Sequence, residues 1–417
     1  MAYIVQAREF EHLGTFASRM IISTNDPQLL RSVIQELKSV AEEAPAGETR
    51  WSMRTYLADA LRQSGQQDQS LALYEQAAVE AEDAEHWSDV SWISQNWANA
   101  LRAIGRLDNA RKTFLRSADA EKKSGGDIVN IWGSELEAIR IDIMQGKARE
   151  VLPDIEKRLE SLRAWWQASR TDRTVEEAPD REILGRAFIS ALDIAGMAYL
   201  RQETWERCLD MLKETELVEK ERGAGDLDLA DTRFNQYPSL LNLNKLSEAQ
   251  QVLEDCLHVF RDNDDTYRQS AALSALASVW NRRGDLRQAI GLERQALSLC
   301  NGLPVPSDRA ISHHNLSNYL HKAGQSDLSK QHFLAALIYR LVMGEQQHLP
   351  NMSHNLSIRI RSTKEKGKRY TLPRITELLG QPEFAPLHQW LGSNNRSDPA
   401  SLQRLRGAVD QFEQQAQ

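Results

Sequence analysis

The chain has 417 residues, of which 21 are glycine, 12 are proline and 26% are charged, and its formal net charge is −8 at pH 7. Alternating β-branched runs are rare, so this composition favours an all-α protein. The acidic balance argues against bulk binding to nucleic acid or to anionic membranes, and it leaves room for a local basic patch.

Residues 1–48 are predicted to form an N-terminal helical cap. A segment lies near 3–20, and Asn25-Asp26-Pro27 marks the start of an amphipathic helix over about 27–43. The region is too short and not basic enough for a helix-turn-helix, which argues against a DNA-reading domain. The apolar residues on the side of the helix that we expect to be buried are Leu29, Leu30, Val33, Ile34, Leu37 and Val40.

Four segments beyond residue 48 share one pattern of two helices joined by a tight turn. They are TYLADALRQSGQQDQSLALYEQAA, NWANALRAIGRLDNARKTFLRSA, ALASVWNRRGDLRQAIGLERQAL and NLSNYLHKAGQSDLSKQHFLAAL. Their turn glycines are 40 residues apart, at 65 and 105 and again at 284 and 324, and such a period indicates a repeat array. Glycine suits a left-handed helix end. Small residues are expected where the two helices cross, at Ala58, Ala98, Ala277 and Ser317.

Weaker copies of the pattern lie between and after these segments. They are IRIDIMQGKAREVLPDI, AGMAYLRQETWERCLDML, YPSLLNLNKLSEAQQVL and a degenerate copy that begins with SHNLSIRI. Glu203 and Asn244 stand in place of two turn glycines. Pro238 falls inside a predicted first helix, where it predicts a kink or a late helix start.

The pattern resembles the tetratricopeptide repeat (TPR) family, in which small residues, a turn glycine and an aromatic residue recur in this order. The 40-residue period is similar to that of kinesin light chains and of bacterial peptide-sensing regulators, so we expect a bacterial source. The resemblance covers residues 49–366 and implies a right-handed α-solenoid of about seven to eight helix pairs. Residues 367–417 are expected to form a C-terminal helical cap that ends in a helix over about 399–416.

An insertion near 161–185 breaks the regular spacing of the repeats. Trp165 and Trp166 are expected to extend the preceding helix, and the polar piece over about 168–180 is expected to loop out as a mobile segment. Two interpretations stay open for this insertion. It is either a long connection with tryptophans packed on the next repeat, or a lid or partner-binding element.

The sequence lacks the common enzymatic motifs HExxH, GxxxxGK[ST], GxGxxG, GxSxG and CxxC, so we predict no enzyme and no cofactor. Histidines are concentrated in the last repeats, where they could converge on one wall as polar groove lining. Acidic partners with metal-ligand spacing do not accompany them, so we predict no metal site. These histidines are His313, His314, His321, His332, His348 and His354.

In TPR relatives the first helix of each repeat lines the concave side, so the resemblance implies a polar groove along these helices. Asparagine and arginine donate hydrogen bonds to peptide carbonyls and carboxylates, which would suit an extended peptide with acidic groups. A row of asparagines occupies one position in four repeats. These residues either hold the backbone of a ligand or bridge to a loop carbonyl of the protein itself, and they are Asn96, Asn235, Asn315 and Asn355. The candidate binding residues are Arg62, Trp92, Gln95, Asn99, Arg102, Asn281, Arg282, His314, Asn318, His321, Lys322, His354 and Arg361.

We therefore predict a non-enzymatic scaffold or adaptor that holds a protein or peptide in the concave groove. One alternative is a subunit of a larger bacterial signalling or defence assembly that binds a folded partner through its outer surface. Another is a nucleic-acid-associated regulator that uses the basic run at 359–369, although a solvated basic loop is the simpler interpretation of that run.

The protein is expected to be cytoplasmic. The N-terminus has no continuous apolar stretch that predicts secretion, and no long uncharged apolar run predicts membrane insertion. Cys208, Cys256 and Cys300 are too few and too far apart for a disulfide framework, so we expect buried, reduced thiols.

Overall fold

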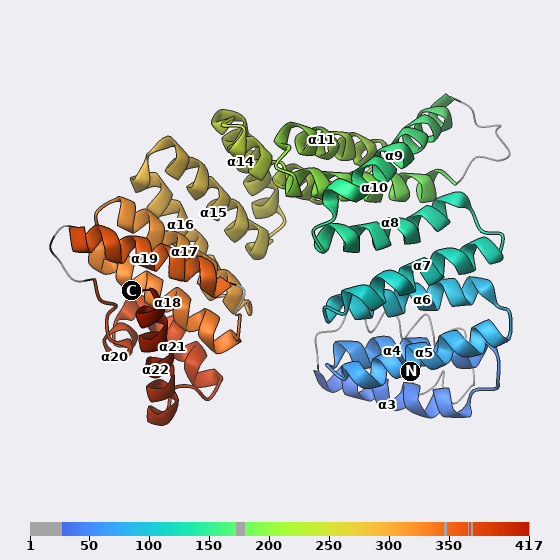
Figure 1. Cartoon of the computed structure of the whole chain (residues 1–417), viewed down its shortest axis with the longest axis horizontal. Coiled ribbons are helices and arrows are strands. Elements are labelled where there is room, and N and C mark those ends of the chain that lie inside the picture. Colours follow the sequence, from blue (N-terminus) through green and yellow to red (C-terminus); the bar gives the residue numbers. More distant parts are fainter. Residues whose placement is uncertain (1–26, 172–179, 346–347, 366, 368–369, 417) are drawn as a thin grey trace. The chain divides into compact units, whose positions relative to one another are not determined.

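The computed structural model describes residues 27–171, 180–345, 348–365, 367 and 370–416. These residues form α-helices and one 3-10 helix, with no strand among them, which confirms the predicted all-α class. The helices group into two compact units, Met1–Gly223 and Ala224–Gln417 (Figure 1). We call them the N-terminal unit and the C-terminal unit. The cap and solenoid bounds, drawn from sequence pattern alone, stay predictions.

The N-terminal unit is a series of helices, each packed on the next. The first helix of the described part, α3, confirms the predicted amphipathic helix, and its apolar side is buried against α4. The segment near 3–20 lies outside the described residues. The helices of this unit are α3 (Pro27–Glu43), α4 (Glu48–Gln63), α5 (Gln67–Asp83), α6 (Trp87–Ala103), α7 (Leu107–Lys123), α8 (Ile128–Met144), α9 (Ala148–Thr171), α10 (Arg181–Arg201) and α11 (Trp205–Glu221).

The turns between paired helices use left-handed backbone, as predicted. Gly65 and Gly105 have φ angles of 83° and 76°. Glu203 and Asn244, which replace the glycine in two weaker repeats, have φ angles of 56° and 57°. A side chain at such a position crowds the following carbonyl, so these two turns carry a small conformational cost.

The small residues at the helix crossings are fully buried, which confirms their expected role. Ala58 and Ala98 have no exposed surface, and neither do Ala277 and Ser317. In the first repeat the hydroxyl of Ser70 donates to the carbonyl of Ala58 at 2.7 Å across the crossing. A larger side chain at these places would force the helices apart.

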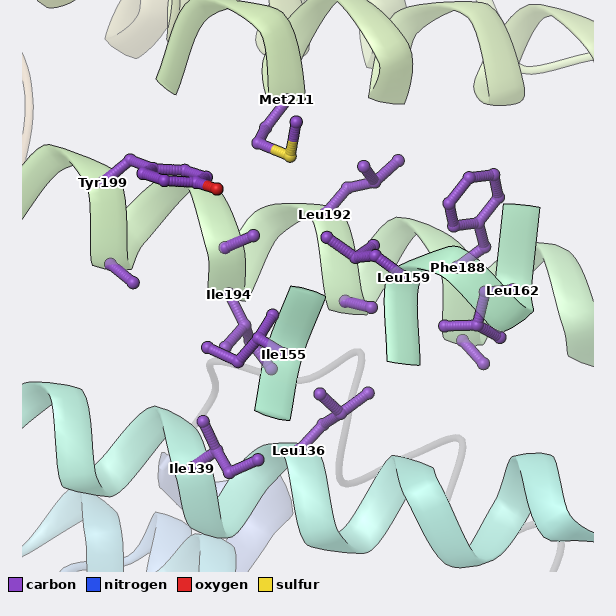
Figure 2. Close-up of a cluster of buried hydrophobic side chains, with 14 of the residues drawn as sticks. Leu136, Ile139, Ile155, Leu159, Leu162, Phe188, Leu192, Ile194, Tyr199 and Met211 are labelled. Carbon is purple, nitrogen blue, oxygen red and sulfur yellow. The ribbon is translucent and has the colours of Figure 1, made fainter. Parts of the chain in front are cut away.

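A cluster of buried apolar side chains joins α8, α9, α10 and α11 (Figure 2). Helix α10 is long and apolar enough to cross a membrane by length and composition, and it alone meets that test among the described helices. It packs on α8, α9 and α11, and Leu192 and Ile194 are fully buried there. The apolar composition of α10 is therefore explained by its contacts with these three helices.

The insertion near 161–185 lengthens the helices on either side of it. Helix α9 has 24 residues and continues to Thr171, further into the polar piece than expected, and Asp180 caps α10 through backbone amides. Trp166 is buried, with its ring 6.5 Å from Phe188, and Trp165 stacks at 5.2 Å on the ring of Trp132. Trp166 packs on the next pair, as the first interpretation expected, whereas Trp165 packs on α8, the helix before its own. Residues 172–179 lie outside the described part.

The C-terminal unit continues the helix pairs. Helix α12 ends at Phe234 and α13 begins at Tyr237, with Pro238 in its first turn, which confirms the predicted interruption. The helices of this unit are α12 (Asp226–Phe234), α13 (Tyr237–Asn242), α14 (Leu246–Asp262), α15 (Thr266–Arg283), α16 (Leu286–Asn301), α17 (Pro306–Lys322), α18 (Ser326–Met343), α19 (Leu349–Glu365), α20 (Ile375–Leu379), η2 (Pro382–Phe384), α21 (Ala385–Ser393) and α22 (Pro399–Ala416).

The last helices close this unit over an apolar core. Helix α18 is buried along most of its length, and α22 packs on both α18 and α19. Phe333, Phe384 and Leu391 are fully buried in this cluster. The predicted terminal helix over 399–416 is confirmed by α22.

Candidate functional site

A pocket of about 540 Å³ lies on the N-terminal unit and is lined mainly by α6, α8 and α10, the first helices of three successive pairs. We call it the N-terminal pocket. Three predicted binding residues, Gln95, Asn99 and Arg102, line it from α6. The other lining residues are Phe114, Val129, Asn130, Gly133, Ser134, Glu137, Ile183, Arg186, Ala187 and Ser190.

The polar groups of the N-terminal pocket are largely paired with one another. The Nε2 of Gln95 donates to Ser134 at 3.0 Å, and a guanidinium nitrogen of Arg102 donates to Asn99 at 2.8 Å. Arg102 also forms an ion pair with Glu137. The charge of Arg102 is therefore compensated within the pocket wall. The side chain of Arg186 is 65% exposed and lies 3.6 Å from Glu182, so its charge stays accessible to a ligand.

The remaining predicted residues of this unit lie outside the N-terminal pocket. Arg62 is half-buried, 3.7 Å from Asp59. Burial raises the pKa of the Asp59 carboxyl, while hydrogen bonds from Tyr74 and Arg62 oppose that shift. Trp92 meets the ring of Tyr56 edge to face at 5.6 Å, so this indole takes part in packing between repeats.

A second pocket, of about 400 Å³, lies on the C-terminal unit. It is lined by the first helices α12, α13, α15 and α17, with one residue from α16. We call it the C-terminal pocket. None of the predicted binding residues is among its lining residues, which are Phe234, Tyr237, Tyr267, Ser270, Ala271, Ser274, Ala275, Ser278, Cys300, Asp308, Ile311, Ser312 and Asn315.

The predicted residues of the C-terminal unit fall into paired and exposed groups. The ammonium of Lys322 donates to Asn281 at 2.8 Å, and Asn318 accepts from Arg359 at 2.7 Å. His321 is half-buried. The exposed residues are Arg282, His354 and Arg361.

The histidines of the last repeats are mostly internal. His313 and His332 are fully buried, with their Nδ1 atoms 2.8 Å apart, so the expectation that they line a groove is wrong. Both rings pack against the ring of Phe384, so they belong to the apolar core of the unit and not to a polar surface. His314 is half-buried, and burial lowers the pKa of its imidazole to about 4. Its Nε2 lies 3.3 Å from the amide of Asn355.

No protein-family model and no curated protein matches the chain. Solved structures resemble it at low identity. The apo quorum sensor NprR from B. thuringiensis has a TM-score of 0.57 and 12% identity, over 79% of this chain and 87% of that one. A Rap protein complexed with Competence and Sporulation Factor has a TM-score of 0.51 and 11% identity, over 98% of this chain and 99% of that one.

A signal transduction ATPase with a tetratricopeptide repeat sensor, from Pyrococcus horikoshii, has a TM-score of 0.55 and 14% identity, over 83% of this chain and 49% of that one. These likenesses agree with the turns and crossings described above. The chain has a TPR-like fold. Its helix pairs are TPR-like pairs, and both pockets lie on the first helices of such pairs.

The basic run at 359–369 of this TPR-like chain is not a uniform cationic surface. Arg359 is buried, and its guanidinium donates to Ser317 at 2.7 Å and lies 5.0 Å from the ring centroid of Phe333. It is therefore unavailable to a nucleic-acid phosphate. Arg361 and Lys364 are exposed, and positions 366, 368 and 369 lie outside the described residues.

Glu293 is a residue that the sequence prediction of the site left out. It stands on α16 at the repeat position where Tyr74, Phe114 and Phe333 occur in other pairs, and it is fully buried behind the C-terminal pocket. Its neighbour Asn315 belongs to the asparagine row named above and lines that pocket. A carboxylate at an aromatic position was the sequence signal that could have identified this site.

Proposed function

We propose that this protein is a non-enzymatic scaffold that binds a peptide or protein segment on the first helices of its TPR-like pairs. The N-terminal pocket is the observation that carries the proposal. It gathers amides, two hydroxyls and guanidinium groups from three successive first helices around one cavity. Side chains of this kind hydrogen-bond a peptide backbone without performing chemistry on it.

The structural neighbours support a peptide or protein partner. NprR is a quorum sensor, and the Rap protein was crystallised with Competence and Sporulation Factor. These properties belong to those proteins, and their identity to this chain is 12% and 11%. For this chain they favour a binding role, which we place in the cytoplasm because its three cysteines are buried and form no disulfide in the described part of the chain.

The N-terminal pocket favours a ligand segment with acceptor groups. Gln95 and Asn99 are exposed and can accept from or donate to a peptide backbone. Arg186 offers an exposed guanidinium whose nearest carboxylate is at 3.6 Å, so a ligand carboxylate could compete for it. An acidic group on the segment is therefore part of the proposal.

The test is a capture experiment from lysate of the source cell, with bound proteins and peptides identified by mass spectrometry. The pocket variant carries Gln95→Ala, Asn99→Ala and Arg186→Ala. We expect at least about tenfold less of the specific partner on this variant than on the wild type, because three charged or polar contacts would be lost.

The matched control carries Arg207→Ala, Asp210→Ala and Lys213→Ala on α11, a second helix whose three side chains are exposed. It should retain the partner as the wild type does. A partner that is kept by the pocket variant and lost from the α11 variant would contradict the proposal and favour binding of a folded partner through the outer surface.

A further inference from the structure

The C-terminal pocket has a buried carboxylate behind its wall. Glu293 has no exposed surface, and its partners are the neutral side chains of Ser312, Ser274 and Asn315. The Oγ of Ser274 lies 3.1 Å from each carboxylate oxygen, and the amide of Asn315 is 3.4 Å from Oε2. All three partners also line the pocket.

This arrangement determines whether the pocket wall donates hydrogen bonds to a ligand or accepts them from it. Because Ser274 donates its hydroxyl hydrogen to Glu293, its remaining lone pairs can only accept hydrogen bonds. Asn315 likewise turns its NH₂ group toward Glu293 and Ser274, which leaves its carbonyl oxygen as an acceptor. The wall therefore accepts hydrogen bonds from a ligand better than it donates them.

A second carboxylate adds negative charge at the pocket. Asp308 lines the pocket from α17, and its Oδ2 is buried without a hydrogen-bond partner among the described residues. Arg340 lies near enough to influence Asp308, but its guanidinium forms an ion pair with Glu345. A buried acceptor without a donor is costly, and a ligand donor would remove that cost.

Aromatic side chains complete the pocket. Phe234 and Tyr237 line it with their ring centroids 5.2 Å apart, and Tyr267 lines it while 52% exposed. Aromatic faces attract cations, and a planar guanidinium stacks on them more readily than an ammonium does. Acceptors, negative charge and aromatic walls thus coincide in one cavity.

We propose that the C-terminal pocket binds an arginine side chain of a polypeptide ligand. The guanidinium would donate to the acceptor oxygens of Ser274, Asn315 and Asp308, and its plane would lie against the aromatic walls. The negative charge of Glu293 would act through the serine and asparagine that separate it from the cavity. This inference concerns a different pocket from the one that carries the proposed function, so either can fail while the other stands.

The test is a ligand-observed NMR titration of the full chain with Nα-acetyl-arginine amide, above the pKa of Glu293. Nα-acetyl-citrulline amide serves as the uncharged analogue of the same shape. Wild-type protein should bind the arginine compound at least about tenfold more tightly than the citrulline compound, as hydrogen bonds to a charged group predict. Equal binding of the two compounds, or no binding of either, would overturn the proposal.

Variants locate the binding in the pocket. Glu293→Gln keeps the shape and removes the charge, so the preference for arginine over citrulline should fall about tenfold, while Glu248→Gln on the exposed face of α14 should change nothing. If Glu293→Gln does not fold, Asp308→Asn and Tyr267→Ala serve instead, since neither residue is in the buried core. An arginine preference that survives both of these changes would show that the binding lies elsewhere.

Discussion

The two pockets are both lined mainly by the first helices of successive pairs, and they differ in how their charged side chains are compensated. In the N-terminal pocket Arg102 pairs with Glu137, which a second arginine, Arg140, also contacts at 3.2 Å. In the C-terminal pocket the partners of Glu293 are neutral. Repeated first helices therefore supply a cavity of similar construction, while a few side chains decide which charge it accepts.

One repeat position accounts for much of this difference. Phe114 on α7 lines the N-terminal pocket, and Glu293 on α16 lies behind the C-terminal pocket. Each stands four residues after the small residue of its second helix, Ala110 or Ala289. An aromatic ring at this position gives an apolar pocket floor, whereas a carboxylate gives an acidic one. Substitutions at the two positions test this comparison.

The largest effect is expected from Phe114→Glu. Phe114 is 1% exposed, so the variant loses the packing of a buried ring and buries a carboxylate near Arg102, whose guanidinium lies 5.8 Å from the ring centroid and is already paired with Glu137. The free energy of unfolding of the N-terminal unit should fall by about 4 kcal/mol or more. Urea unfolding followed by circular dichroism measures it.

Phe114→Leu is the control for lost volume without added charge, and it should cost less than half as much. If Phe114→Glu lowered the free energy of unfolding no more than Phe114→Leu does, the residue type at this position would not explain the difference between the two pockets.

The next effect concerns the pH dependence of the C-terminal unit. Burial raises the pKa of Glu293 to about 7, against an ordinary value of 4.5. Its contribution to stability is therefore complete below pH 4.5 and is lost between pH 4.5 and about 7, because the unfolded chain ionises more easily. Glu293→Gln should remove this loss and raise the free energy of unfolding above pH 7 by about 3 kcal/mol relative to the wild type.

The difference between wild type and Glu293→Gln is the quantity to measure, because other groups titrate in the same unit. Burial lowers the pKa of His314, which destabilises the unit as the pH falls. Tyr237, Tyr319, Cys300 and Asp308 also lie near Glu293 or its pocket and interact with it or with one another. A difference that does not change between pH 4.5 and 7 would contradict the buried state of Glu293.

A smaller effect is expected at the paired charges of the N-terminal pocket. Arg102→Ala removes an ion pair whose partners are 30% and 24% exposed, and Arg140 still compensates Glu137. The loss of stability should be about 1 kcal/mol, and it should shrink at high salt. Thermal unfolding at two salt concentrations measures this loss. A loss as large as that of Phe114→Glu would contradict the claim that Arg140 compensates Glu137 once Arg102 is removed.

The smallest effect concerns the turns. Glu203→Gly should stabilise the N-terminal unit by about 0.5 kcal/mol, because relief of the left-handed strain exceeds the added entropy of the unfolded chain. Asn244→Gly should give a smaller gain in the C-terminal unit, since asparagine tolerates this backbone conformation. Matched thermal unfolding curves compare the two. A loss of stability in Glu203→Gly would contradict the strain assigned to this turn.

The fold was predictable from sequence because TPR-like pairs are specified locally. A turn glycine ends one helix, and small residues mark the crossing with the next, so Gly105 and Ala98 identify a pair without reference to distant residues. Even Glu203 and Asn244 could be recognised as turn residues from their spacing alone.

The site was predictable only in part, because it depends on contacts between residues far apart in the chain. Gln95, Asn99 and Arg102 were identified from their place on a first helix, and they line one pocket together. The burial of Arg359 depends on Ser317 and Asn318, which lie on the first helix of the preceding pair. The exposure of a single polar residue on a repeat cannot be derived from its repeat position alone.

Site-specific photo-crosslinking in the source cell tests the central claim most directly. A photoreactive amino acid replaces Asn130 in the N-terminal pocket or Tyr267 in the C-terminal pocket, and Lys213 or Gln295 on second helices as controls. The account predicts that a peptide or protein is crosslinked from the pocket positions and not from the controls. A partner crosslinked only from Lys213 or Gln295 would contradict it.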